Sequence, residues 1–359
     1  MNQEECLKTV SYLLEKIEAR TTPANMIIAD YMQTHRYLTP ADREEIFTLV
    51  WRAIRSWFHI HFLYPDKDWP ERIQTLTTGL PEDKALPDYV RWEVPEWLIS
   101  HIPEADKELP ALLEPAPVIL RANGNRDKVM TALRDEGFPV HPCDKAPWGI
   151  VLKTHADITK TKVYKKGLLE IQDEGAQLAA LDVGVQPGQD VFDFCAGAGG
   201  KSLIFAQMMN NRGFIQAYDI APKKLFELTR RAERCHVSIV KIVTKLPEPF
   251  KKFHHVVVDA PCSGTGTWRR VPDMRWKLTE KQLGSIVAQQ KEILDRAEQF
   301  VKPGQCLTYI TCSLTLDENE NQIADFLKRH PNYVVLQQKR YSPWRTNTDG
   351  FFMCQMRKG

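Results

Sequence analysis

The sequence contains no CxxC pair and no apolar run long enough to cross a membrane. Its eight cysteines are scattered over 359 residues, which argues against a disulfide framework and favours free thiols in a reducing cytoplasm. No basic segment followed by an apolar run opens the chain, so we expect no signal peptide. The formal net charge of +2 gives little support to binding of nucleic acid by overall charge. We therefore predict a cytoplasmic globular protein without a membrane anchor or a bound metal ion.

Positive charge is nevertheless concentrated in two short stretches. The first cluster consists of Lys160, Lys162, Lys165 and Lys166, and the second of Lys223, Lys224, Arg230, Arg231 and Arg234. Such clusters favour contact with a polyanion, although they carry no information about its sequence.

The first part of the chain, residues 1–111, is predicted to be a helical domain. Apolar residues recur at helical spacing between Leu7 and Ile17. Thr39 precedes Pro40 and an acidic turn, which is typical of the start of a helix.

The rest of the chain alternates between predicted strands and helices. Residues 112–166 form a small α/β module, with strands expected at 118–123 and 149–152 and a helix at 127–136. Within 167–359, apolar β-branched runs at 190–193, 213–219, 255–259 and 307–311 are separated by helical segments. This alternation is typical of a doubly wound, mostly parallel sheet, whose ligands bind at the carboxyl ends of the strands.

A glycine-rich turn follows the first of these runs, between Asp193 and Ser202. A dinucleotide-binding loop would need a third glycine where Ser202 stands, and a phosphate-binding P-loop would need a glycine in place of Cys195. A loop for S-adenosylmethionine (SAM) needs glycines for close approach but no pyrophosphate cradle, and a purely structural turn is the remaining alternative. Asp219 ends the second run, where a carboxylate suits a ribose with two free hydroxyls or simply caps the next helix.

Two cysteines leave strands at the same predicted edge. Cys262 follows Asp259 and a proline, and Cys312 follows the last run, whereas the other six cysteines are expected to be structural. A lone buried cysteine is usually inert, but a pair at corresponding strand ends suits covalent catalysis. A thiolate that adds to C6 of a cytosine makes C5 nucleophilic enough to take a methyl group, and a carboxyl group at the base favours that addition.

These residues resemble the RNA (cytosine-5) methyltransferases of the Sun/Nop2/NSUN family, and most of all its bacterial branch that methylates small-subunit ribosomal RNA. The similarity covers roughly 112–359. It is carried by Gln172-Asp173-Glu174, the loop 193–202, the stretch 259–266, Arg270 with Pro272-Asp273 and Trp276, Thr311-Cys312-Ser313, Glu318-Asn319-Glu320 and Asp349-Gly350-Phe351-Phe352.

The resemblance implies a Rossmann-like SAM-dependent methyltransferase domain at 167–359 and a role for each site residue. Cys312 would be the nucleophile, Cys262 would promote release of the methylated product, and Asp259 would contact the cytosine, with Lys201 near the same catalytic face. The residues implied to bind SAM are Ala196, Gly197, Ala198, Gly199, Gly200, Lys201, Asp219 and Asp259.

The resemblance also implies an RRM-like module at 112–166 and a shortened NusB-like RNA-binding domain at 1–111. RNA is the implied partner, with ribosomal (16S) RNA favoured and transfer RNA possible, and no obligate protein partner is expected. The lysine cluster ending at Lys166 would then guide the RNA backbone.

The chain departs from the family pattern at two places. Gly197-Ala198 replaces an Ala-Pro step in the loop, and Val243-Thr244-Lys245-Leu246 lacks the carboxylate that usually meets the adenine amine, which leaves Thr244 or main-chain groups to do so. Two further classes remain open: a P-loop NTPase, which leaves both cysteines unexplained, and a non-catalytic RNA-binding or ribosome-assembly factor. A DNA cytosine-5 methyltransferase would instead attack with Cys262.

Overall fold

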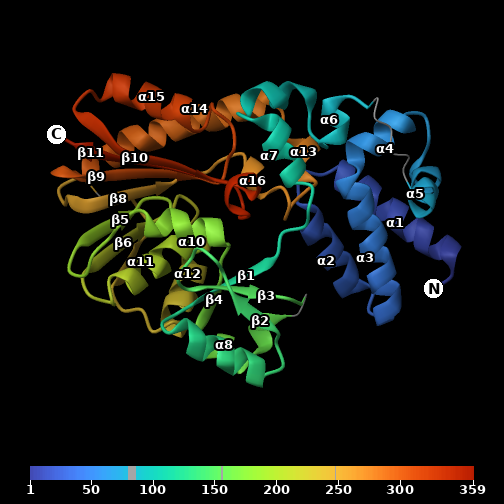
Figure 1. Ribbon diagram of the computed structural model, residues 1–359, viewed down its shortest axis with the longest axis horizontal. Coiled ribbons are helices and arrows are strands. Elements are labelled where there is room, and N and C mark those ends of the chain that lie inside the picture. Colours follow the sequence, from blue (N-terminus) through green and yellow to red (C-terminus); the bar gives the residue numbers. More distant parts are fainter. Residues whose placement is uncertain (80–85, 155–156, 247) are drawn as a thin grey trace. The chain divides into compact units, whose positions relative to one another are not determined.

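The computed structural model describes residues 1–79, 86–154, 157–246 and 248–359 (Figure 1). They form two compact units, one of residues 1–115 with 267–283, and one of 116–266 with 284–359. The small module and the large sheet fall within one unit, so the division into three domains at 111 and 166 stays a prediction. No helix in these ranges combines the length and apolar character needed to span a bilayer.

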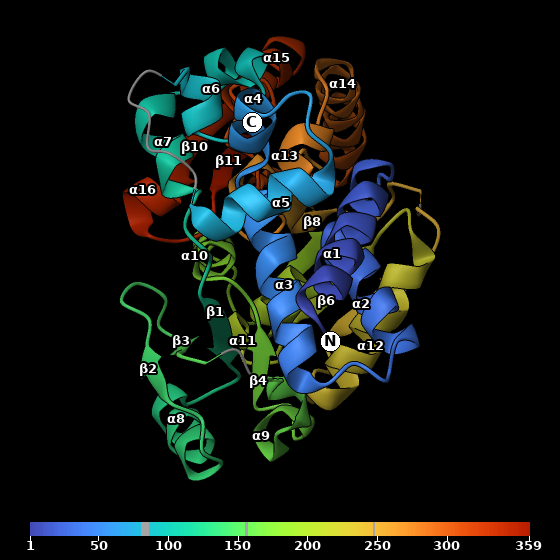
Figure 2. The same ribbon diagram turned by 90° about the vertical axis from the view of Figure 1, so that its right-hand side faces the viewer.

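The first unit is helical, as its sequence predicts. Thr39 and Asp42 form a capping box at the start of the third helix, and α1 buries the apolar face between Val10 and Ile17. Helices α1, α3 and α5 pack against one another (Figure 2). The elements are α1 (Gln3–Glu18), α2 (Ala24–Thr34), α3 (Pro40–Arg55), α4 (Trp57–Leu63), α5 (Trp69–Thr78), α6 (Asp88–Arg91), η1 (Glu96–His101) and α7 (Ala105–Ala111).

Residues 267–283 belong to this helical unit although they lie far along the chain. The ring of Trp276, on α13 (Met274–Lys277), stacks on that of Trp57 with centroids 4.1 Å apart and planes inclined by 6°. The carboxylate of Asp273 accepts hydrogen bonds from the Ala24 N–H and the Lys277 ammonium, both at 2.9 Å. No local pattern in the sequence indicates that 267–283 packs with the N-terminal helices.

The second unit begins with a four-stranded antiparallel sheet of order β2-β3-β1-β4. Its βαββαβ sequence of elements is that of an RRM. One face packs on α8 and α9, while Arg121 and Glu170 on the other face contact Gln207 and Arg231 of the large-sheet part. The elements are β1 (Val118–Ala122), α8 (Arg126–Asp135), β2 (Val140–Pro142), β3 (Gly149–Leu152), η2 (Ile158–Lys160), α9 (Lys162–Lys165) and β4 (Leu169–Ile171).

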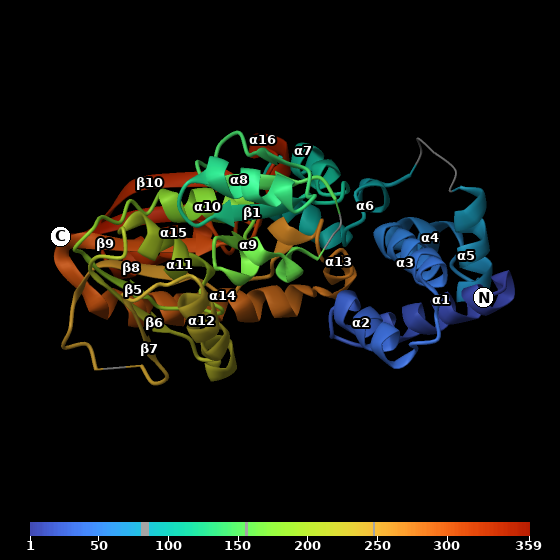
Figure 3. The same ribbon diagram turned by 90° about the horizontal axis from the view of Figure 1, so that it is seen from below.

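The large sheet has seven strands in the order β10-β11-β9-β8-β5-β6-β7. Figure 3 shows the run from β9 to β7, whose neighbours are parallel, whereas β11 is antiparallel to both β9 and β10. The predicted doubly wound, mostly parallel sheet is confirmed. The strands are β5 (Asp190–Asp193), β6 (Phe214–Tyr218), β7 (Val240–Val243), β8 (Phe253–Asp259), β9 (Val301–Thr311), β10 (Tyr333–Tyr341) and β11 (Phe351–Lys358).

Helices cover both faces of this sheet (Figure 1). Val191 and Val257 face the layer of α10 and α11, while Phe192 and Val256 face α14 and α15. Burial on both faces explains why these strands read as continuous apolar runs. The remaining elements are α10 (Glu174–Leu181), α11 (Gly200–Met208), α12 (Pro222–Arg234), η3 (Thr265–Thr267), α14 (Glu280–Ala297), η4 (Glu298–Phe300), α15 (Glu320–Arg329) and α16 (Pro343–Thr346).

Candidate active site

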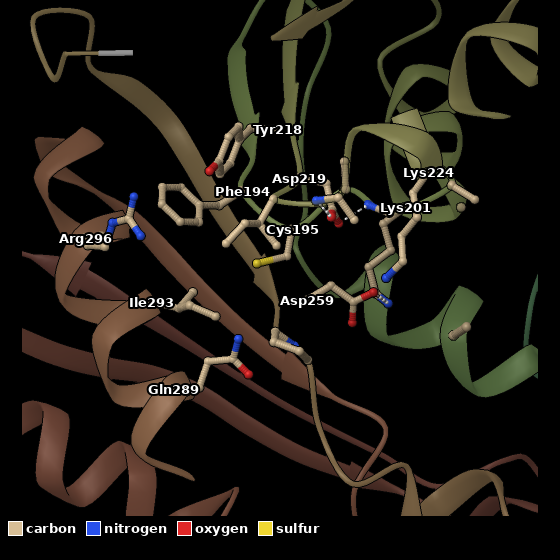
Figure 4. Close-up of a pocket in the computed structure, with 18 of the residues that line it drawn as sticks. Phe194, Cys195, Lys201, Tyr218, Asp219, Lys224, Asp259, Gln289, Ile293 and Arg296 are labelled. Atoms are coloured by element: carbon tan, nitrogen blue, oxygen red, sulfur yellow. Dashed lines mark hydrogen bonds and ion pairs between the residues drawn. The ribbon is translucent and has the colours of Figure 1, made fainter. Parts of the chain in front are cut away.

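The carboxyl ends of four parallel strands meet at one edge of the large sheet. Strand β5 ends at Asp193, β6 is followed by Asp219, β8 ends at Asp259, and β9 is followed by Cys312. A cavity of about 500 Å³ opens there, within the range of small-molecule sites (Figure 4). Its wall includes these residues implied by the resemblance: Ala196, Gly197, Ala198, Gly200, Lys201, Asp219 and Asp259.

The glycine loop owes its shape to two left-handed glycines, Gly197 (φ +54°) and Gly199 (φ +85°). A Cβ on Gly199 would lie 2.1 Å from Cδ1 of Leu228, so the bare backbone at this position lets α12 pack against the loop. Gly199 is not among the residues that line the cavity. Gly199 therefore serves the packing of α12 against the loop.

The carboxylate of Asp219 is fixed by two backbone donors. Its Oδ2 accepts from the Gly197 N–H at 2.9 Å, and its Oδ1 accepts from the Ala221 N–H at 2.8 Å. The bond from the Ala221 N–H lies at the start of α12, where a carboxylate commonly accepts from the first backbone N–H groups of a helix. Because Asp219 also lines the cavity, it joins the glycine loop, the helix start and the ligand space.

Lys201 and Asp259 form an ion pair in the cavity wall, with Nζ and Oδ2 2.6 Å apart (Figure 4). Beneath them, fully buried Asp193 accepts a hydrogen bond from the Ser202 hydroxyl at 2.6 Å. Burial raises the pKa of Asp193 to about 7, and the negative charge of Asp259 adds to that rise. The burial of Asp193 could not be predicted, since nothing in the local sequence pattern indicates it.

The two cysteines singled out from the sequence lie side by side, with their sulfurs 3.2 Å apart. Strands β8 and β9 are parallel neighbours, which brings the residues that follow them together. The hydrogen bond with Cys312 and burial raise the pKa of the Cys262 thiol well above its usual range. Cys195, expected to be structural, lies in the cavity wall, but burial raises the pKa of its thiol strongly.

Apolar side chains that sequence reasoning missed line one end of the cavity. Phe194 and Tyr218 come from the ends of β5 and β6, and Ile293 comes from α14 (Figure 4). Thr244 follows β7 and is not among the residues that line this cavity, and its contact with adenine stays a prediction. Phe194 and Tyr218, two aromatic residues at the ends of adjacent strands, were the sequence feature that could have indicated this apolar wall.

This fold and this cavity define a SAM-dependent methyltransferase. Residues 180–357 match the family described as 16S rRNA methyltransferase RsmB/F. The probable ribosomal RNA small subunit methyltransferase B of Bacillus subtilis is 30% identical over 317 residues, which cover 78% of this chain and 71% of the relative. The corresponding protein of Photorhabdus laumondii is 30% identical, with 74% and 66% covered. The chain belongs to this family, spans about two thirds of these relatives' length, and has SAM as its cofactor.

Solved structures agree on the fold. A methyltransferase homolog from Pyrococcus horikoshii has a TM-score of 0.67 at 25% identity and covers 76% of this chain and 97% of its own. The protein PH0851 reaches a TM-score of 0.82 at 20% identity, with 100% and 99% covered. NSun6 from P. horikoshii, solved with the SAM analogue SFG, has a TM-score of 0.67 at 18% identity, with 77% and 99% covered.

Proposed function

We propose that this chain forms 5-methylcytosine in ribosomal (16S) RNA, with Cys312 as the nucleophile and Cys262 as the group that aids release. The observation that carries the proposal is the 3.2 Å approach of the two sulfurs at the strand edge that also holds Asp259. The names of the relatives, which are ribosomal RNA small subunit methyltransferases, support the choice of RNA.

The cavity fits SAM by the chemistry of its wall. Asp219 offers carboxylate oxygens to the ribose hydroxyls, and the backbone of 196–198 and 200–201 allows close approach of the amino-acid part. Phe194, Tyr218 and Ile293 would hold the adenine ring by apolar contact in place of the missing carboxylate. When bound, SAM supplies an electrophilic methyl group at the face where Asp259 lies.

The protein groups then divide the reaction between them. The thiolate of Cys312 forms a bond to C6 of the cytosine. Asp259, paired with Lys201, contacts the base, and the ammonium charge of Lys201 balances the negative charge that develops on the ring. C5 takes up the methyl group, and its proton then passes to a water molecule, so that the electron pair of the C–H bond forms the C5–C6 double bond. The bond between C6 and sulfur then breaks, and its electron pair returns to Cys312. Cys262 keeps its thiol proton and donates a hydrogen bond to the departing sulfur.

The exposed lysines give a path for the RNA backbone. All four lysines of the first cluster are exposed on η2, α9 and the residue after them. In the second cluster Arg231 and Arg234 instead pair with buried Glu170, which leaves Lys223, Lys224 and Arg230 exposed on α12. Arg234 also donates to the Tyr164 carbonyl at 3.0 Å, so α9 and α12 are adjacent. Together these cations offer exposed positive charge to phosphates from two adjacent helices, although Lys160 also pairs with Asp157 and Arg230 with Glu227.

The test is methyl transfer from labelled SAM to small-subunit RNA and, separately, to transfer RNA, both from cells that lack this activity. We expect label in 5-methylcytidine at one position of the ribosomal RNA. Label in transfer RNA alone would correct the substrate. Absence of transfer, together with absence of SAM binding by calorimetry, would favour a non-catalytic RNA-binding factor.

A further inference from the structure

The buried carboxylate of Glu318 accepts hydrogen bonds from the loop that carries Cys262. Glu318 is 0% exposed and lies in the loop that leads into α15. Its Oε1 accepts from the Ser263 N–H at 2.8 Å and its Oε2 from the Ser263 hydroxyl at 2.5 Å. Gln290 of α14 donates to the same Oε1 at 3.0 Å and to the Pro261 carbonyl at 3.0 Å. The residues before and after Cys262 are therefore fixed together.

The same carboxylate holds the loop of the second cysteine. Its Oε2 accepts from the hydroxyl of Ser313, the residue after Cys312, at 2.5 Å. The neighbouring amide of Asn319 accepts from the Thr311 hydroxyl at 2.6 Å and donates to the Ser313 carbonyl at 2.9 Å. Both flanks of Cys312 are thus tied to the short segment that contains Glu318.

Within the described residues, neutral groups supply five hydrogen bonds to the Glu318 carboxylate, the fifth coming from the Thr315 hydroxyl at 3.0 Å. A buried carboxylate is expensive to desolvate, and an apolar residue of similar volume is often no less stable in such a place. A fully bonded network instead fixes geometry. The presence of a buried charge at Glu318 therefore favours a role in positioning the two cysteine loops.

We propose that Glu318 is a positioning residue that holds the sulfurs of Cys262 and Cys312 within hydrogen-bond reach of each other. It thereby sets the rate at which methylated RNA is released. The inference rests on the proposed two-cysteine function and adds to it the residue that aligns the pair. The negative charge of Glu318 also contributes, after the hydrogen bond with Cys312 and burial, to the raised pKa of Cys262.

The first test separates the two arms of this network. Ser263→Ala removes the hydroxyl bond to Glu318 on the Cys262 side. Ser313→Ala removes the corresponding bond on the Cys312 side, together with the contacts of the Ser313 hydroxyl with Thr265 and Thr315 at 3.1 Å. Both variants remove the contact between the two serine hydroxyls at 3.3 Å. The first variant should release product slowly and raise the steady-state fraction of covalent protein–RNA adduct, while the second should attack slowly and lower it. Loss of a hydrogen bond to a charged group predicts a change of about tenfold in each direction. A purely structural role would move both variants the same way, and that result would overturn the proposal.

The second test needs neither RNA nor methyl transfer. Glu318→Gln keeps the shape, removes the charge and turns one acceptor into a donor. The ultraviolet absorbance of the Cys262 thiolate, taken as the difference from the matching variant with Cys262→Ala, should titrate at a lower pH than in wild type, because the negative charge of Glu318 is gone. Glu320→Gln is the matched control, because that carboxylate pairs with Arg340 instead of the cysteine loops. An unchanged midpoint in Glu318→Gln would overturn the proposal.

The outcomes distinguish the alignment of the pair from the reaction itself. If neither wild type nor Cys262→Ala forms an adduct, the two-cysteine function fails, while the thiolate midpoint still reports whether the charge of Glu318 acts on Cys262. Thermal unfolding and SAM binding report whether each variant folds. If Glu318→Gln does not fold, the opposite responses of the two serine variants decide the matter.

Discussion

Replacing Gly199 by alanine should damage the cofactor loop through packing. The backbone φ of +85° disfavours a side chain, at a cost of about 1–2 kcal/mol. The added Cβ would lie 2.1 Å from Cδ1 and 3.1 Å from Cβ of buried Leu228, and overpacking of this kind costs about 1–3 kcal/mol. We therefore expect the free energy of unfolding to fall by about 2–5 kcal/mol.

The same substitution should weaken SAM binding at a distance. Leu228 lies on α12, and a displaced α12 would pull the Ala221 N–H away from Asp219, which it holds at 2.8 Å. Loss of one hydrogen bond to a carboxylate predicts affinity lower by about tenfold. Denaturant titration gives the stability, and calorimetry with SAM gives the affinity.

Gly197→Ala is the matched control for this reasoning. Its φ of +54° is also left-handed, but the nearest atom to the added Cβ is Oδ2 of Asp219 at 3.9 Å, an ordinary contact. Its cost should stop at about 1–2 kcal/mol. In the Gly199→Ala background, Leu228→Ala should recover part of the loss by removing the clash. Equal losses at the two glycines, or no coupling with Leu228, would refute the packing argument.

Three further predictions concern other parts of the molecule. The pKa of Asp193 is about 7 in the folded protein and near 4 in the unfolded chain, so the free energy of unfolding should fall between pH 4 and 7 by on the order of 4 kcal/mol. Thermal scans of Asp193→Asn should lack this pH dependence, and parallel curves for wild type and variant would contradict the assignment. Lys165→Glu with Lys166→Glu should lower RNA affinity and flatten its salt dependence in filter binding, whereas an unchanged slope would remove these lysines from the RNA path. Trp276→Ala removes the ring stacked on Trp57 and should destabilise the helical unit by about 2–4 kcal/mol, seen as faster proteolysis of residues 1–115; unchanged protection would count against that contact.

The strands that position the site were predictable because they are buried on both faces. Strands β5, β6, β8 and β9 read as apolar β-branched runs. The expected ranges of β5, β6 and β8 lie within two residues of the observed ones, whereas β9 begins at Val301, six residues before the expected start. Strand β10 was not singled out, since it is an edge strand that exposes Val334, Val335 and Leu336 and carries polar residues after them. Its pattern matches neither an amphipathic nor a fully buried strand.

The pairing of Cys262 with Cys312 was also predictable, because parallel strands end at one edge of the sheet. The roles of Glu318 and Asp193 were not. The partners of Glu318 come from the loops after β8 and β9 and from α14, and only the folded chain brings these together. The stack of Trp57 on Trp276 escaped notice for the same reason, since 219 positions separate the two rings in sequence (276 − 57).

The division of labour between the two cysteines is tested most directly by trapping the enzyme on its substrate. Cys262→Ala and Cys312→Ala would each be incubated with SAM and the RNA that accepts methyl groups, then resolved under denaturing, non-reducing conditions. We expect a covalent protein–RNA adduct to accumulate with Cys262→Ala, and neither adduct nor turnover with Cys312→Ala. An adduct in Cys312→Ala, or equal loss of activity without an adduct in either variant, would contradict the account.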